Sequence, residues 1–254
     1  MTPARVLIIA GSDSSGGAGI QADIKTAQAF GCYAMTAITA VTVQNTRGVS
    51  AIHAVPPDIV AGQIEACLTD IGADAIKIGM LGSAKLVKAV AAALEGVRVP
   101  VVLDPVMVST SGHRLLPQAA ERALVKELFP LASVVTPNLP ETRALVGRGN
   151  AESCARKLMS LGARAALIKG GHATSATVDD VLVWSGGVET YAFPRIRTKH
   201  THGTGCTLST AIACGLAQHL SLPLAVGRAR EYVQAAIETA PGLGRGHGPL
   251  NHSV

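Results

Sequence analysis

The residue types best suited to chemistry are concentrated in residues 198–209, which read TKHTHGTGCTLS. Glycines and small hydroxyl residues lead there into an apolar helical pattern over 207–220, so unpaired backbone N–H groups at the positive end of a helix can hold an anion. Cys206 falls at the first turn, where the helix dipole favours its thiolate. A lone GTGC is equally compatible with a structural turn and a small buried cysteine. Lys199 and His202 favour a phosphate site, because a structural turn needs no cation.

Three further charged residues follow short apolar runs. Asp104 comes after the run 101–103 and Glu141 follows the run 133–135 by a few residues. Two such carboxylates could hold a hydrated Mg²⁺. Glu141 alone is better explained as a stabiliser of the start of the helix that Pro140 begins. Lys169, with two glycines after it, can bring charge and bare backbone to a phosphate.

A glycine-rich loop over 11–19 joins an apolar strand pattern to a helical pattern, an arrangement typical of ligand-binding α/β proteins. Its glycine spacing matches neither the Walker motif nor GxGxxG, so a P-loop NTPase and a nicotinamide enzyme are not supported. The loop's acids, Asp13 and Asp23, are each compatible with a turn or a solvated helix position. Gln44, at the end of the next strand pattern, could read a heterocycle by hydrogen bonds. Met80 follows another strand and is compatible with plain core packing.

These residues require a scaffold that brings strand ends together. Apolar runs predict buried strands that alternate with helical patterns, which indicates a three-layer α/β domain with one crevice at the carboxyl ends of a mostly parallel sheet. Two patterns, 180–184 and 189–193, predict an antiparallel edge hairpin. The glycine-rich tail 242–249 is typical of disorder. The predicted strands cover 6–10, 34–43, 75–79, 101–103, 133–135 and 165–168, and the helices 57–71, 83–94, 117–129, 151–161, 207–220 and 222–240.

Composition narrows the class of protein. The 254 residues suit one domain over 1–254, with 48% hydrophobic and 15% charged residues and no apolar run long enough to cross a membrane. No secretion signal is recognisable, so we expect a cytoplasmic protein. The five cysteines are scattered without a CxxC pair, which argues against zinc and disulfides. The net charge of +5 is spread out, so nucleic acid is not an expected partner.

Taken together, seven motifs resemble the bacterial hydroxymethylpyrimidine and phosphomethylpyrimidine kinases of thiamine biosynthesis, within the ribokinase-like superfamily. In chain order the motifs are GSDSSGGAGIQADIKT (11–26), VQNTRGV (43–49), KIGML (77–81), VLDPVM (102–107), TPNLPE (136–141), KGGH (169–172) and KHTHGTGCTLS (199–209). They span nearly the whole chain in the family's order. The resemblance implies a ribokinase-like α/β/α sandwich, ATP and Mg²⁺ as cofactors, and a homodimer.

The resemblance also implies roles for individual residues. The pyrimidine would lie near Gly11, Asp23, Gln44, Met80 and Val106. The ATP phosphates would lie over the helix start, and Mg²⁺ near Asp104 and Glu141. Lys169 and Cys206 would be catalytic, with Cys206 as a thiolate that takes the proton of the substrate hydroxyl. The residues expected around ATP and its phosphates are Asn138, Thr201, His202, Gly203, Thr204 and Gly205.

The expected reaction is ATP-dependent phosphorylation of 4-amino-5-hydroxymethyl-2-methylpyrimidine and then of its monophosphate. Pyridoxal or pyridoxine kinase is the nearest alternative. Relatives that trap the aldehyde carry a cysteine in the covering segment, and 109–114 has none, which favours the pyrimidine. A non-catalytic pyrimidine-binding sensor is a further alternative. A redox sensor built on Cys206 is the last one.

Overall fold

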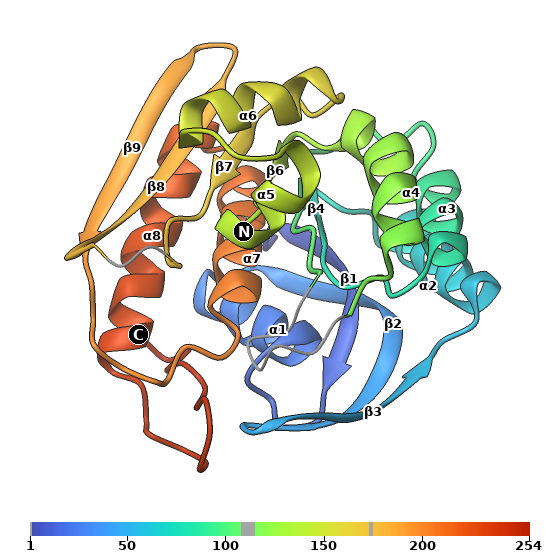
Figure 1. The fold of residues 1–254 in the computed structure, drawn as a ribbon. Coiled ribbons are helices and arrows are strands. Elements are labelled where there is room, and N and C mark those ends of the chain that lie inside the picture. The colour runs from blue at the N-terminus through green and yellow to red at the C-terminus, as the bar shows by residue number, and fades with distance from the viewer. Residues whose placement is uncertain (1, 108–114, 173–174) are drawn as a thin grey trace.

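A computed structural model describes residues 2–107, 115–172 and 175–254. Its strands form one nine-stranded sheet within the described residues, in the order β3-β2-β1-β4-β5-β6-β7-β8-β9 (Figure 1). The strands are β1 (Arg5–Asp13), β2 (Tyr33–Asn45), β3 (Gly48–Ala54), β4 (Ala75–Ile78), β5 (Val101–Leu103), β6 (Val134–Val135), β7 (Ala166–Ile168), β8 (Thr177–Trp184) and β9 (Gly187–Pro194). The helices are α1 (Gly19–Ala29), α2 (Pro57–Asp70), α3 (Ala84–Ala93), α4 (Gln118–Leu128), η1 (Phe129–Leu131), α5 (Leu139–Val146), α6 (Ala151–Ser160), α7 (Thr204–Ala217) and α8 (Leu222–Glu238).

The centre of the sheet is parallel and covered on both faces. Strands β2, β1, β4, β5, β6 and β7 pair in parallel, whereas β3, β8 and β9 join antiparallel at the two edges. Side chains of β1 alternate between two cores: Leu7 and Ile9 face α2, α3, α4 and α6, while Val6 and Ile8 face α1, α7 and α8. Figure 1 shows these two helix layers on opposite sides of the sheet. The predicted three-layer, mostly parallel architecture is therefore confirmed.

The hairpin at the first edge departs from the prediction. Strand β2 extends to Asn45, and an additional strand, β3, pairs with it after a two-residue connection. Five of the seven residues of β3 are not apolar β-formers, so no strand pattern is visible in its sequence. At the opposite edge the predicted antiparallel hairpin is confirmed as β8 and β9.

The glycine-rich tail is ordered, contrary to the expectation. The backbone N–H of His247 donates to the carbonyl oxygen of Thr46 at 2.7 Å, and that of Gly246 donates to the Thr46 hydroxyl at 3.1 Å. A Cβ atom on Gly246 would overlap the Thr46 carbonyl, so the close approach requires glycine. The carbonyl of Gly248 accepts from the N–H of His202 at 3.1 Å. The tail thus joins the β2–β3 turn to the segment before α7.

Candidate active site

One cleft of about 990 Å³ lies at the carboxyl ends of the central strands. Open α/β sheets bind their ligands at this edge. Residues from seven distant segments line it, and all of the predicted site residues except Asp23 are among them. The sequence motifs therefore converge on one site, as expected.

The start of α7 forms one wall of the cleft. The helix begins at Thr204, three residues earlier than predicted, so Cys206 lies inside its first turn. Gly203 precedes it with φ of 84°, a left-handed conformation that favours glycine. A Cβ atom there would also overlap the carbonyl oxygen of Gly17, so the glycine lets the helix start approach the β1–α1 loop. Gly203 has no side chain to cap the helix. The N–H of Thr204 donates to the Thr201 carbonyl oxygen at 3.3 Å, which leaves the next N–H groups of the first turn available to an anion.

Lys169 and Asp104 form an ion pair against this helix start. The Lys169 Nζ lies 2.7 Å from Asp104 Oδ1, with side chains 13% and 2% exposed. A Cβ atom on Gly205 would lie 3.3 Å from Lys169 Nζ and 3.4 Å from Asp104 Oδ2, so both charges face the α7 backbone. Burial opposes the charge on Lys169, but Asp104 and Glu141 outweigh it and raise the pKa of the lysine. A fixed cation therefore stands beside the predicted phosphate site.

Glu141 has the helix-stabilising role that the sequence left open. It forms a capping box at the start of α5: its Oε2 accepts from the Asn138 N–H at 2.8 Å, and its own N–H donates to Asn138 Oδ1 at 2.9 Å. Its Oε1 accepts from the Met107 N–H at 3.3 Å. Burial raises the pKa of Glu141 to about 7, with Asp104 adding to the rise and Lys169 opposing it.

The pair Asp104 and Glu141 fits a magnesium ion. Both groups are carboxylates, the hard oxygen ligands that Mg²⁺ takes. Besides burial, the negative charge of Asp104 raises the pKa of Glu141, so the two carboxylates repel each other. Residues 2–107, 115–172 and 175–254 contain no group of three His, Cys, Asp or Glu side chains placed to hold a metal. A site with two carboxylates matches Mg²⁺ that also binds water and substrate phosphates.

Four of the predicted pyrimidine contacts also line the cleft. A Cβ atom on Gly11 would lie 3.0 Å from Met80 Cε, so the two residues are in contact. The carbonyl of Met80 accepts from the Thr39 hydroxyl at 2.6 Å, which fixes this residue after β4. Val106 lines the cleft from the segment after β5, and Gln44 lines it from β2.

Asp23 does not reach the cleft, which corrects the expectation that it contacts the ring. Its side chain has no exposed surface and accepts hydrogen bonds from Lys77 Nζ and from the Thr210 hydroxyl, both at 2.7 Å. Burial would lower the pKa of Lys77, but the Asp23 carboxylate reverses this and raises it. Lys77 adjoins the cleft wall, but its side chain is as fully buried as that of Asp23. In the sequence, Lys77 could have been noticed as the one charged residue in the apolar strand β4.

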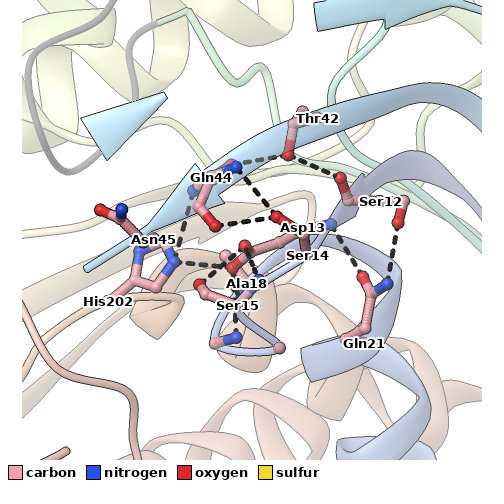
Figure 2. Close-up of polar contacts among 12 residues, drawn as sticks. Ser12, Asp13, Ser14, Ser15, Ala18, Gln21, Thr42, Gln44, Asn45 and His202 are labelled. Carbon is pink, nitrogen blue, oxygen red and sulfur yellow. Dashed lines mark hydrogen bonds and ion pairs between the residues drawn. The ribbon is translucent and has the colours of Figure 1, made fainter. Parts of the chain in front are cut away.

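The side chain of His202, predicted near the phosphates, contacts Asp13 and the predicted ring contact Gln44. Figure 2 shows its imidazole directed at Asp13 and Gln44. Its Nε2 lies 2.8 Å from Asp13 Oδ2 and 3.4 Å from Gln44 Nε2, and its backbone N–H is used by the tail. Asp13 has the expected turn role, since it accepts from the N–H groups of Ser15 and Ala18 at 2.8 Å. Its link to His202 spans 189 residues and was not predicted.

The predicted thiolate at Cys206 is wrong for the protein without bound ligands. Burial raises the pKa of the Cys206 thiol to about 11, and the attraction of the Lys77 ammonium does not offset it. The carboxylates of Asp23 and Asp104 add to the rise. The helix dipole is therefore outweighed by poor solvation, and Cys206 is a thiol at neutral pH.

The loop that carries Lys169 is held by a buried ion pair that sequence reasoning missed. Asp180 Oδ1 accepts from the Gly170 N–H at 2.7 Å, and its Oδ2 lies 2.9 Å from Arg230 Nε. A Cβ atom on Gly170 would overlap the Asp179 carbonyl oxygen, so the backbone packs tightly there. Arg230 also lines the cleft. The predicted covering segment 109–114 lies outside the described residues.

An uncapped helix start, a lysine and a pair of carboxylates at the end of a ribokinase-like sheet define a small-molecule kinase of the ribokinase-like class. The family model for phosphomethylpyrimidine kinase matches residues 13–251. The chain belongs to this family, which confirms the resemblance seen in the motifs. Within the described residues every helix is too short or too polar to cross a membrane.

Individual relatives agree with the family. The chain is 50% identical to a bifunctional thiamine biosynthesis protein of Geobacter sulfurreducens, over 97% of this chain and 52% of that protein, so it spans about half the length of this relative. It is 47% identical to a hydroxymethylpyrimidine/phosphomethylpyrimidine kinase of Streptomyces coelicolor, over 99% of this chain and 95% of that one.

Two solved structures show the same fold. Bacillus subtilis pyridoxal kinase in complex with ADP superposes with a TM-score of 0.91 at 35% identity, covering 99% of this chain and 98% of that one. A phosphomethylpyrimidine kinase from Clostridium difficile superposes with a TM-score of 0.81 at 40% identity, covering 92% of this chain and 99% of the other. The expected ribokinase-like fold is thereby confirmed.

Proposed function

We propose that this chain transfers the γ-phosphoryl group of ATP to the hydroxymethyl oxygen of 4-amino-5-hydroxymethyl-2-methylpyrimidine, and then to the phosphate of the monophosphate, in thiamine biosynthesis. One observation carries the proposal. The Lys169–Asp104 pair and the α7 start lie in the same cleft as Gln44 and Met80. The residues that we assign to the phosphates and to the ring therefore line one cavity. Membership of the phosphomethylpyrimidine kinase family supports the choice of ring.

Phosphoryl transfer needs alignment and charge neutralisation more than covalent chemistry. The N–H groups of Gly203 and Gly205 would bind the phosphates, with Thr201, Thr204 and Asn138 beside them. Lys169 would neutralise charge on the migrating group, because its Nζ faces the helix start. Mg²⁺, when held by Asp104 and Glu141, would neutralise further charge on the phosphates.

The proton of the attacking hydroxyl needs an acceptor. The substrate oxygen forms a bond to the γ-phosphorus, the bond from that phosphorus to the bridging oxygen of ADP breaks, and the hydroxyl proton leaves. We assign the acceptor to Cys206, whose sulfur lies at the helix start with Lys77 close enough to favour the thiolate. Because the thiol dominates at neutral pH, the minor thiolate population carries this step.

A second candidate, pyridoxal kinase, is favoured by the close superposition on the Bacillus subtilis enzyme. The test is mass-spectrometric product analysis with Mg·ATP and, in parallel, hydroxymethylpyrimidine, its monophosphate and pyridoxal. Pyrimidine mono- and diphosphates with little pyridoxal phosphate are expected. Efficient pyridoxal phosphorylation without pyrimidine diphosphate would overturn the proposal and move the chain to the vitamin B6 kinases.

The proposal includes one kinase domain over residues 1–254, a cytoplasmic location and a homodimer. Val41 and Val43 on β2 are 50% and 60% exposed, an apolar pair beside the sheet edge that a second copy could cover. Light scattering after size exclusion tests the dimer, and Val43→Asp should shift the population to monomer. A monomeric wild-type protein would contradict this part of the proposal alone.

A further inference from the structure

The carboxamide of Gln44 is held between two polar groups at the ring side of the cleft (Figure 2). One terminal atom lies 3.2 Å from the Thr42 hydroxyl oxygen and the other 3.4 Å from His202 Nε2. The oxygen and nitrogen of a carboxamide exchange places by a half-turn of the terminal torsion, and the hydrogen-bond network decides between the two orientations. The protons on Thr42 and His202 therefore determine what Gln44 offers to a ligand.

Asp13 fixes the proton on His202. Its Oδ1 accepts from the N–H and the hydroxyl of Ser15, and its Oδ2 accepts from the N–H groups of Gly17 and Ala18. A carboxyl proton would displace one of these donors, so Asp13 is ionised and can only accept. Because Asp13 Oδ2 lies 2.8 Å from His202 Nε2, that nitrogen carries a proton and acts as a donor.

Ser12 fixes the proton on Thr42 in the same way. The Thr42 hydroxyl lies 2.9 Å from the carbonyl oxygen of Ser12, which can only accept, so the single hydroxyl proton is used there. The Thr42 oxygen keeps its lone pairs and faces the Gln44 carboxamide as an acceptor. The single N–H of His202 is directed mainly at Asp13 and reaches Gln44 only as a second, weaker contact at 3.4 Å. Gln44 thus has a weak donor at His202 and an acceptor at Thr42.

Only one orientation of the carboxamide satisfies both neighbours. Its oxygen must face the His202 N–H, and its NH₂ group must face the Thr42 oxygen. We propose that Asp13, His202 and Thr42 are positioning residues that hold Gln44 in this orientation, so that its free C=O lone pair and free N–H read a ring edge bearing an amino group next to a ring nitrogen. The proposal rests on the proposed pyrimidine substrate and adds residues that select its ring.

The fixed orientation creates a preference between two nearly isosteric rings. In a 4-aminopyrimidine the exocyclic group donates and the adjacent ring nitrogen accepts, which matches C=O and N–H of Gln44. In the 4-oxo analogue both roles are reversed. The exocyclic oxygen then faces the C=O of Gln44, acceptor against acceptor, and the ring N–H faces the N–H of Gln44, donor against donor. A carboxamide free to turn could serve either ring. A Gln44 carboxamide held in one orientation should bind the oxo ring about 100-fold or more weakly than the amino ring, because buried polar groups would be left unpaired.

The experiment measures ring binding without turnover. Calorimetry compares 4-amino-2,5-dimethylpyrimidine with 2,5-dimethylpyrimidin-4-one on the full chain, because neither probe carries a hydroxymethyl group to phosphorylate. Wild type should prefer the amino probe. Thr42→Val and His202→Phe should each reduce the preference about five- to tenfold, mainly by gaining affinity for the oxo probe, and the double variant should nearly abolish it. Thr42→Ser, which keeps the hydroxyl, is the matched control and should retain the preference.

Each outcome is decisive for the positioning role. Equal binding of both probes to wild type, or a full preference in both single variants, would overturn it. A loss of affinity for both probes in equal proportion would also overturn it, because that result indicates a merely structural role. Wild type that phosphorylates hydroxymethylpyrimidine without discriminating between the probes would refute the positioning role alone. Discrimination without phosphoryl transfer would refute the proposed function and leave the positioning role intact.

Discussion

Lys77 and Asp23 form an ion pair with 2.7 Å between Nζ and Oδ2, and neither side chain has any exposed surface. Removing one partner of a buried pair strands the other charge, which typically costs about 3–5 kcal/mol. We therefore expect Lys77→Met to lower the free energy of unfolding by about this amount, measured by urea unfolding under circular dichroism. A cost below about 1 kcal/mol would contradict the isolation of the pair from water.

Two further variants test whether the loss of stability comes from the stranded, buried charge. Adding Asp23→Asn to Lys77→Met removes the stranded charge while keeping an acceptor for the Thr210 hydroxyl, so part of the lost stability should return. Arg156→Ala removes an ion pair to Glu152 whose side chains are 59% and 50% exposed, and it should change stability little.

Cys206 gives the second prediction, a pH dependence of turnover. Because the pKa of its thiol is raised to about 11, the thiolate fraction grows about tenfold for each pH unit between 7 and 9. If the thiolate takes the hydroxyl proton, kcat should rise along the same slope at saturating substrate. Cys206→Asp supplies a base already ionised at neutral pH, so its kcat should be nearly independent of pH in that range.

The Cys206→Ala variant tests whether the cysteine accepts a proton at all. It should lose about 100-fold or more in kcat, with a smaller change in KM. Turnover near the wild-type level across this pH range would show that alignment alone drives the reaction.

The fold was predictable where local sequence and packing agree. Strands β1, β4 and β5 are buried on both faces and read as apolar runs, so their sequence carries the signal of a central parallel strand. Strand β3 is at an edge with five of its residues exposed, so no apolar pattern marks it. The tail is held by hydrogen bonds to Thr46, about 200 residues away in sequence, and to His202. Such partners are invisible to a local pattern.

The site was predictable as a set of strand-end residues but not as a set of pairs. Parallel topology alone brings Asp104, Asn138 and Lys169 to one edge. Which partner each side chain takes depends on the packing of distant segments, as in the link between Asp13 and His202. For Asp23, an acid in the motif suggested a ligand contact, yet its carboxylate pairs with a lysine 54 residues further on.

Because of Asp13, we expect the free energy of unfolding to depend on pH. Its burial raises the pKa, but the hydrogen bonds from His202 and Ser15 outweigh that effect and lower it to about 2. A carboxyl group whose pKa is lower in the folded protein stabilises above its unfolded pKa, near 4, and that contribution is lost as the pH falls toward 2. The difference amounts to about 2 kcal/mol. Asp13→Asn should be less stable than wild type at pH 6 by about this amount, and the gap should narrow to about a third at pH 2.5.

Urea unfolding at several pH values measures this gap, with Asp58→Asn on the surface of α2 as the control. A gap that stays constant from pH 6 to pH 2.5 would contradict the ionised Asp13 on which the orientation of Gln44 depends.

Glu141 provides the last prediction because its helix-capping and metal-binding roles can be separated. Glu141→Gln keeps an oxygen that can accept from the Asn138 N–H, so the capping box and the start of α5 should survive. The variant loses one of the two carboxylates that fit Mg²⁺, so the Mg²⁺ concentration for half-maximal turnover should rise about tenfold or more. Melting without Mg²⁺ should show a stability close to that of wild type, because removal of a buried negative charge offsets the loss of the acceptor for the Met107 N–H. An unchanged Mg²⁺ requirement would assign Glu141 to the helix alone and leave Asp104 as the carboxylate that binds the ion.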